Sequence, residues 1–255
     1  MNADSQRLCA WGGPVLIVLF VFGWGVLGGF LPPPSPNATP QETVRFFEGS
    51  PTSIRLGLLL CMTGAAFLGL WTAAISVQLK RIEGRHSPLT YAQLALGSVA
   101  IVEFVTPLLI WQACAYRPAD DPMITQRFND LAWLMWVAVD ASFVLQAIVI
   151  GIAILKDQRA TPIFPRWLAY MSFWCALLFC PGGLCVFFKS GPFDWGGLIA
   201  FWLLAAAYVS WVITITVVLL KRSIPQHEQV WQAEDSTSGS PGPMLGGTYP
   251  DAVHQ

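Results

Sequence analysis

Residues 131–155 read LAWLMWVAVDASFVLQAIVIGIAIL, an apolar run that contains a single charged residue, Asp140. An α-helix crosses the hydrocarbon core of a bilayer with about 20 mostly apolar residues. The run is long enough to do this, and it therefore predicts a membrane-spanning helix.

Five other stretches have the same character, and proline or glycine residues punctuate the gaps between them. The expected spans are 14–31, 56–79, 91–114, 131–155, 167–188 and 195–220. The sequence therefore predicts an all-α fold, a polytopic membrane bundle of six transmembrane helices over residues 14–222. A short N-terminal segment (1–13) precedes it, and a polar tail (223–255), rich in Gly, Ser and Pro, is expected to be disordered.

Composition supports a membrane protein. Hydrophobic residues make up 55% of the chain and charged residues 11%, whereas a soluble domain carries roughly 25% charged residues. The net charge of −1 gives no electrostatic signal for nucleic acid, which we exclude as a partner. The six cysteines are scattered through apolar segments and are expected to be free, although a Cys114–Cys185 bridge stays open.

Basic residues orient the bundle. One set of loops holds nine of them and the alternate set five, and loops rich in Lys and Arg stay in the cytoplasm. Both termini are therefore expected on the cytoplasmic side. We expect the first span to be uncleaved, since Trp24, Phe30 and the run Pro32–Pro34 make a poor signal-peptide cleavage site; cleavage is the alternative. The nine are Arg7, Lys80, Arg81, Arg85, Lys156, Arg159, Arg166, Lys221 and Arg222; the five are Arg45, Arg55, Arg117, Arg127 and Lys189.

Two acids lie inside expected spans. Glu103 is about eleven residues from the outer end of the third span, and Asp140 is about nine residues from the outer end of the fourth, so both sit near mid-membrane. A charged acid there costs at least about 2.5–3.5 kcal/mol and must face protein or water. Since no Lys, Arg or His lies at that depth, we expect at least one acid to be protonated, as in a proton-coupled transporter.

Pro107 adds to this site. A helical proline frees the carbonyl oxygen four residues earlier, which here belongs to Glu103, and Thr106 lies close by. Glu103, Asp140, Thr106 and Pro107 are therefore the candidate proton or substrate site. The alternative is structural: the acids bond to each other or to residues such as Ser142 or Gln146.

A second feature is Pro181-Gly182-Gly183 in the outer half of the fifth span. This triplet interrupts a helix, and the exposed backbone is tolerated in a membrane only where protein or water satisfies it. It predicts an outward-facing vestibule, with a kink that fits neighbouring helices as the alternative.

Other chemistry is not indicated. His86, His227 and His254 lie in loops or the tail, so no haem or metal site is expected in the bundle. No phosphate loop and no catalytic residue is recognised, so we expect no enzyme and no cofactor. The tryptophans at expected span ends predict an interfacial belt. These are Trp11, Trp111, Trp133, Trp167 and Trp195.

A string of motifs runs through the last two expected spans: Phe164-Pro-Arg-Trp167, Pro181-Gly-Gly183, FFKSGPFDWGGL over residues 187–198, and Phe201-Trp202. This string resembles a group of uncharacterised bacterial multi-pass membrane proteins. The resemblance covers the last two spans. It implies a bacterial inner, or plasma, membrane, and it transfers no functional residue.

The favoured function is a small transporter or permease-like protein for an apolar or amphipathic small molecule, with proton coupling left open. A non-catalytic subunit of a larger membrane complex is the alternative, and it would need another membrane protein as partner. An enzyme acting on lipid or sterol ranks third. The lipid bilayer is the one partner that every version requires.

Overall fold

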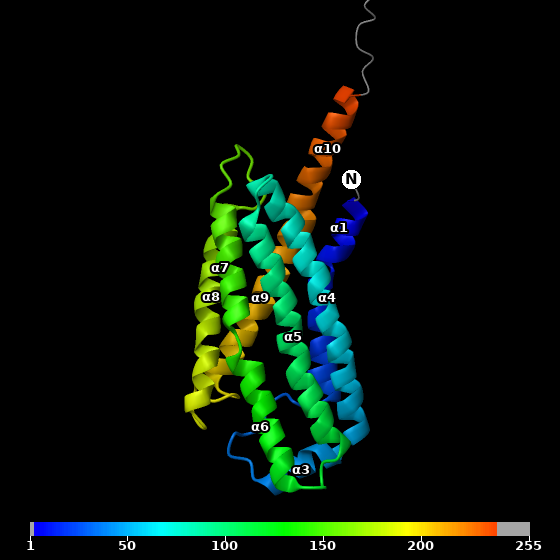
Figure 1. The fold of residues 1–255 in the computed structure, drawn as a ribbon, viewed down its shortest axis with the longest axis vertical. Coiled ribbons are helices and arrows are strands. Elements are labelled where there is room, and N and C mark those ends of the chain that lie inside the picture. Colours follow the sequence, from blue (N-terminus) through cyan, green and yellow to red (C-terminus); the bar gives the residue numbers. More distant parts are fainter. Residues whose placement is uncertain (1–2, 239–255) are drawn as a thin grey trace, which may run out of the picture.

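The structure, a computed structural model, describes residues 3–238, and over that range the regular elements are all helices (Figure 1). Within it, six helical segments are long and apolar enough to cross a membrane. They are Ala3–Leu27, Pro51–Glu83, Pro88–Tyr116, Pro122–Leu155, Arg166–Phe187 and Leu198–Ala233. The chain is therefore an α-helical, multi-pass integral membrane protein, as predicted.

Several spans are composites of shorter helices. The three π-helical segments are η1, η3 and η4, and η2 is a 3₁₀-helix. In chain order the elements are α1 (Ala3–Ala10), α2 (Gly12–Phe20), η1 (Val21–Leu27), α3 (Pro40–Gly49), α4 (Pro51–Glu83), α5 (Pro88–Tyr116), α6 (Pro122–Ala138), α7 (Ala141–Leu155), α8 (Arg166–Phe179), η2 (Cys180–Phe187), η3 (Leu198–Leu203), α9 (Leu204–Val218), η4 (Leu219–Ser223) and α10 (Ile224–Ser238).

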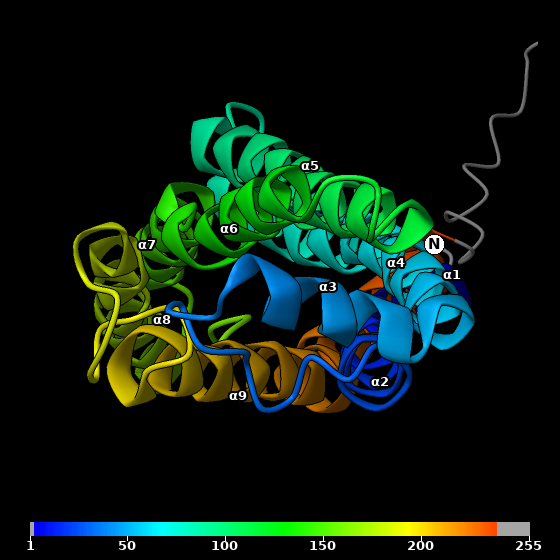
Figure 2. The ribbon, with the colours of Figure 1, turned by 90° about the horizontal axis from the view of Figure 1, so that it is seen from below.

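The spans form a ring. Helix α4 packs on α2 and α5, α5 packs on α6 and α7, α7 packs on α8, and α9 packs on both α8 and α2. Figure 2 looks along this ring and shows α3 lying across one end of it, between the spans. We call this end the α3 end. The short helix closes the ring there and hides its interior from the aqueous side.

Helix α3 is built to stay in place. Thr39 and Glu42 form a reciprocal capping box, in which the Thr39 backbone N–H donates to the Glu42 carboxylate over 2.7 Å. These hydrogen bonds lower the pKa of Glu42 from its ordinary value. On the inner face of α3, Phe47 is fully buried and packs edge-on against Phe30.

The tryptophan belt is only partly as expected. Trp11 and Trp167 are exposed to the surroundings of the bundle, at 54% and 52%, as interfacial residues should be. Trp111, Trp133 and Trp195 are instead buried in one aromatic cluster. The reason is the cover that α3 provides, because it converts the end of the ring from an interface into a core.

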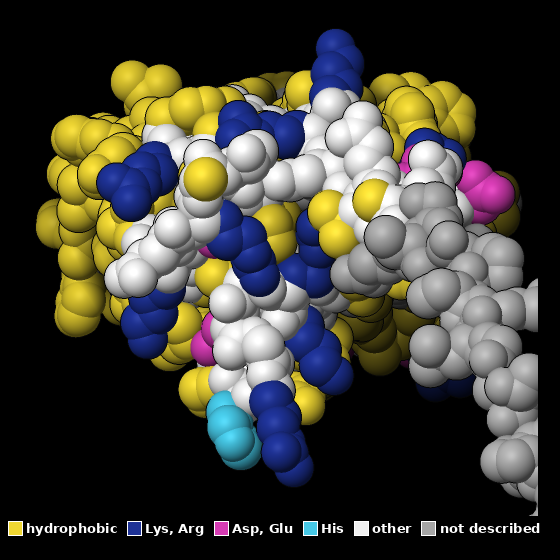
Figure 3. Space-filling view, turned by 90° about the horizontal axis from the view of Figure 1, so that it is seen from above, with side chains coloured by type: hydrophobic (Ala, Val, Ile, Leu, Met, Phe, Trp, Pro, Cys, Tyr) yellow, Lys and Arg dark blue, Asp and Glu magenta, His cyan; other side chains and the backbone are white. Residues whose placement is uncertain are grey.

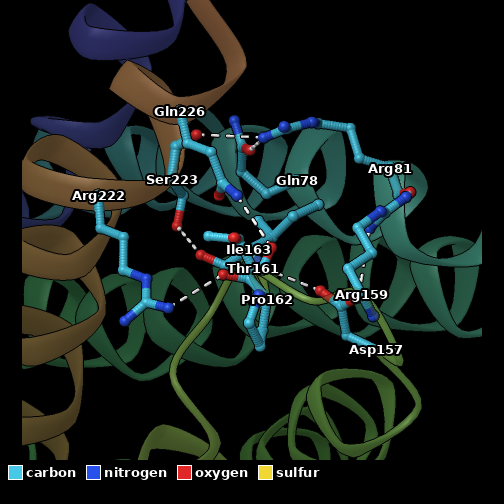
Figure 4. A network of polar contacts seen from close by, with 10 residues as sticks. All are labelled: Gln78, Arg81, Asp157, Arg159, Thr161, Pro162, Ile163, Arg222, Ser223 and Gln226. Carbon is cyan, nitrogen blue, oxygen red and sulfur yellow. Dashed lines mark hydrogen bonds and ion pairs between the residues drawn. The ribbon is translucent and has the colours of Figure 1, made fainter. Parts of the chain in front are cut away.

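The opposite end of the ring carries the basic residues. Figure 3 shows Lys and Arg side chains gathered on the end of the bundle from which α1 and α10 project. We call this the basic end. There the loop after α7 is tied down by Asp157, which accepts from the backbone N–H of Ile163, and by Ser223, which donates to the Ile163 carbonyl (Figure 4).

The tail differs from its prediction where it is described. Residues 224–238 form helix α10 rather than a disordered segment. Arg7 of α1 pairs with Glu228 of α10 over 2.8 Å, which holds the two short helices together. Residues 1–2 and 239–255 lie outside the described residues, and so does the predicted disorder of that part of the tail.

Candidate functional site

The fourth span is interrupted in its middle. Helix α6 ends at Ala138 and α7 begins at Ala141, with Val139 at φ −91° and ψ 80°. This differs from the continuous helix 131–155 that its apolar run predicts. Asp140 occupies the N-cap position of α7. The acid therefore lies at the partially positive end of a half-helix inside the membrane, a position that attracts negative charge.

The fifth span changes from an α-helix to a 3₁₀-helix opposite this break. Helix α8 ends at Phe179 and continues as the 3₁₀-helix η2, which contains Pro181, Gly182 and Gly183. A Cβ on Gly182 would lie 2.6 Å from the Val137 carbonyl oxygen and 3.4 Å from Asp140 Oδ2. Only glycine allows the backbone of η2 to approach the broken span so closely.

Asp140 thus stands between two interrupted spans. The Asp140 side chain makes no capping hydrogen bond to the N-terminus of α7. Its Oδ2 atom is buried without a hydrogen-bond partner. Sequence reasoning singled out the acid and the glycine pair separately, and the structure brings them into one place.

A cavity of about 240 Å³ lies against Asp140. Nine of the twenty described residues that line it are aromatic. Phe104 packs on Trp136 with ring centroids 5.4 Å apart, and Phe143 packs on Tyr208 with centroids 5.4 Å apart. Among the described residues that line it, Asp140 is the only charged one. The Tyr208 hydroxyl and the Trp24 indole N–H, both at this cavity, are buried without hydrogen-bond partners.

Part of the cavity wall reaches the outer surface of the bundle. Val21, Val139 and Trp202 line the cavity and are 55%, 41% and 43% exposed. In a membrane the surroundings of these residues are lipid, while α3 lies across the end of the ring (Figure 2).

Glu103 occupies a different environment from Asp140. It lies on α5 next to Phe104, which lines the cavity, but Glu103 itself does not. Its Oε2 atom accepts a hydrogen bond from the Ser142 hydroxyl on α7. Ser142 is one of the partners that the structural interpretation of the sequence names.

The region around Pro107 is more regular than its sequence suggests. Helix α5 continues through this buried proline from Pro88 to Tyr116. The Thr106 hydroxyl donates to the Val102 carbonyl of its own helix over 2.8 Å. Neither Thr106 nor Pro107 lines the cavity.

On the basic-end side of Glu103 lies a column of polar side chains, of which sequence reasoning named only Gln146, as a structural partner of the acids. Gly97 of α5 is flanked by Thr72 of α4 and Gln146 of α7, and further along Ser76 donates to Gln93 over 2.5 Å. All four polar residues are buried, and both polar atoms of Gln146 lack hydrogen-bond partners. A spacing of four residues places two side chains on the same face of a helix. The pairs Thr72–Ser76 and Ser142–Gln146 show this spacing inside apolar spans, and this pattern could have revealed the polar column.

Metal and disulfide chemistry find no support within the described residues. No group of three or more His, Cys, Asp or Glu side chains there could hold a metal ion, and the cysteines of this part of the chain are free. Cys114 donates to the Thr125 carbonyl instead of meeting Cys185.

Comparisons with protein-family models, with curated proteins and with solved structures find no match to this chain. The resemblance to bacterial inner-membrane proteins therefore stays a prediction. The geometry of the chain itself shows a multi-pass membrane bundle whose cavity holds one unpartnered carboxylate.

Proposed function

We propose that the protein is a small transporter or permease-like protein that binds an apolar or amphipathic small molecule in the cavity at Asp140. One observation carries the proposal: Asp140, a half-buried acid whose Oδ2 atom is buried without a hydrogen-bond partner, lies between two interrupted spans and borders a cavity. A carboxylate at this depth is costly and is retained mainly where it serves a function. Interrupted spans that meet near the bilayer midplane are how many secondary transporters build their substrate sites.

The exposed part of the cavity wall supports a ligand that reaches the protein through the membrane. Its exposed lining residues Val21, Val139 and Trp202 are apolar and lie at the surface that lipid would cover. An amphipathic molecule that partitions into the bilayer would meet this part of the wall directly. A strongly hydrated solute would have to shed its water within the hydrocarbon region, which is unfavourable.

The polar column supports proton coupling. Glu103 and Ser142 mark its start near mid-membrane, and Gln146, Thr72, Ser76 and Gln93 continue it toward the basic end. Polar side chains at this spacing bind bridging waters readily, and chains of hydrogen bonds conduct protons. We infer that Glu103 exchanges protons with the aqueous phase at the basic end, which we assign to the cytoplasm from its excess of Lys and Arg.

The first test is purification from native membranes in mild detergent, followed by mass spectrometry of everything that accompanies the protein. We expect a lipid or small molecule in near-stoichiometric amount with the wild type and its loss from Asp140→Asn. Asp130→Asn, the same chemical change at an acid of α6 that does not line the cavity, is the matched control and is expected to retain the molecule. Asp140→Glu, which keeps the charge, separates loss of the carboxylate from damage to the fold.

Two results would overturn the proposal. A small molecule that stays equally bound in Asp140→Asn would place it outside this site. A stoichiometric protein partner with no small molecule would favour the subunit alternative and leave the acids with structural roles.

A further inference from the structure

We propose that the ligand of the cavity is an amphipathic organic monocation, a protonated or quaternary amine attached to an apolar body. This inference rests on the proposed function, because it names the chemical class that the same cavity selects. Asp140 would neutralise the charge of the amine, and the aromatic walls would receive the apolar body.

The charge balance of the cavity favours a cation. Asp140 is the only charged residue among the described lining residues, and its Oδ2 atom has no hydrogen-bond partner. No basic residue is among these described lining residues. A carboxylate withdrawn from water requires a counter-charge or hydrogen bonds to offset its desolvation. A neutral ligand provides no counter-charge, and an anionic ligand would add repulsion.

The half-helix α7 does not replace the missing counter-charge. A helix N-terminus carries roughly half an elementary positive charge, spread over its free N–H groups. The Asp140 side chain makes no capping hydrogen bond to this N-terminus. Its Oδ2 atom stays free to accept a hydrogen bond from an ammonium group.

The walls are suited to an organic cation rather than a metal ion. Phe104, Phe143 and Tyr208 line the same cavity as Asp140 and pack on one another. The Phe104 and Phe143 centroids are 5.3 Å apart, and the Phe104 and Tyr208 centroids are 5.9 Å apart. Aromatic faces attract desolvated ammonium groups. A metal cation would instead need several oxygen ligands, and the described lining offers two oxygen-bearing side chains, those of Asp140 and Tyr208.

The size of the cavity sets the size of the ligand. A cavity of about 150 Å³ accommodates benzene. A cavity of about 240 Å³ therefore has room for one ring and a few further heavy atoms. Phenyltrimethylammonium has this size and a permanent positive charge, and tert-butylbenzene has the same shape without the charge. This pair isolates the contribution of charge.

The test measures binding of both compounds to the purified full-length protein by the fluorescence of its tryptophans, since Trp24, Trp136 and Trp202 line the cavity. We expect phenyltrimethylammonium to bind the wild type and Asp130→Asn equally, and to lose at least about 30-fold in affinity in Asp140→Asn. Asp140→Glu should retain part of the affinity. Trp136→Leu, which leaves the acid in place, should weaken binding of both compounds.

Each outcome decides the inference. Stronger binding of the cation than of its neutral isostere, with the difference removed by Asp140→Asn, supports it. Equal binding of both compounds, unchanged in Asp140→Asn, overturns the cation class but leaves the cavity as an amphipathic site. If neither compound binds, the inference is overturned, and so is the idea that the cavity binds ligands of this size. This conclusion holds whether or not another molecule co-purifies with the protein.

Discussion

At the scale of single residues, the two membrane acids divide into different roles. Glu103 has a side-chain partner in Ser142 and borders a column of polar residues. Asp140 has an oxygen without a hydrogen-bond partner and borders a cavity. The sequence predicts the same membrane depth for the two acids, but their environments in the structure differ. In the proposed function, we therefore assign proton exchange to Glu103 and ligand binding to Asp140.

This division predicts how Glu103→Gln behaves. In reconstituted vesicles, uptake of labelled phenyltrimethylammonium by the wild type should respond to an imposed pH gradient. Glu103→Gln should bind the cation with unchanged affinity but transport it at the level of empty vesicles, because glutamine cannot take up and release the proton. Transport by this variant that follows the pH gradient as in the wild type would remove Glu103 from the mechanism.

At the scale of elements, the feature that matters is the contact between the broken fourth span and η2. The two interruptions meet at Gly182, where the η2 backbone lies against the Val137 carbonyl and the Asp140 carboxylate. An α-helix in both spans would have kept these backbones apart and left no space for the cavity. The arrangement therefore depends on one position that cannot carry a side chain.

Two neighbouring glycines give a matched test of this contact. A Cβ at Gly182 would lie 2.6 Å from both the Val137 carbonyl oxygen and Leu204 Cδ1, whereas at Gly183 the nearest atom would be 3.9 Å away. Gly182→Ala should therefore destabilise the protein by about 1–3 kcal/mol through overpacking. Gly183→Ala should change stability by less than about 0.5 kcal/mol.

Thermal unfolding in detergent and binding of phenyltrimethylammonium measure the two effects separately. Gly182→Ala is expected to lower both the melting temperature and the affinity. Equal behaviour of the two variants would show that the close approach at Gly182 does not hold the site together.

At the scale of the whole molecule, the two ends of the ring differ in chemistry. The basic end carries most of the Lys and Arg residues and the helices α1 and α10, and α3 closes the other end (Figures 1 and 3). Under the proposed function, the ligand would enter from the side of the ring and the proton from the basic end. This separation would prevent the cavity from short-circuiting the proton gradient.

The orientation that underlies this scheme is testable by thiol labelling. In a background without Cys9 and Cys180, single cysteines would replace Gln41 on α3 and Ala160 at the basic end, both of which are exposed. A membrane-impermeant maleimide should label Gln41→Cys on intact cells, and should label Ala160→Cys only after permeabilisation. The reverse pattern would place the basic end outside and reject the predicted orientation.

The sequence alone determined the class of protein and the approximate spans. Hydropathy is a local property, so a run such as 131–155 reveals a membrane segment without knowledge of its neighbours. The same is true of Glu103 and Asp140, since any acid in an apolar run is conspicuous. The asymmetry of basic residues and the Pro-Gly-Gly triplet were equally visible.

The tertiary structure alone decided which of these features form one site. The interruption at Val139–Asp140 has no proline or glycine to announce it, and it faces Gly182, more than forty residues further along the chain. The burial of Trp111 and Trp133 required the cover of α3. Contacts of this kind join distant segments, and their energies depend on shape and desolvation, which local composition does not encode.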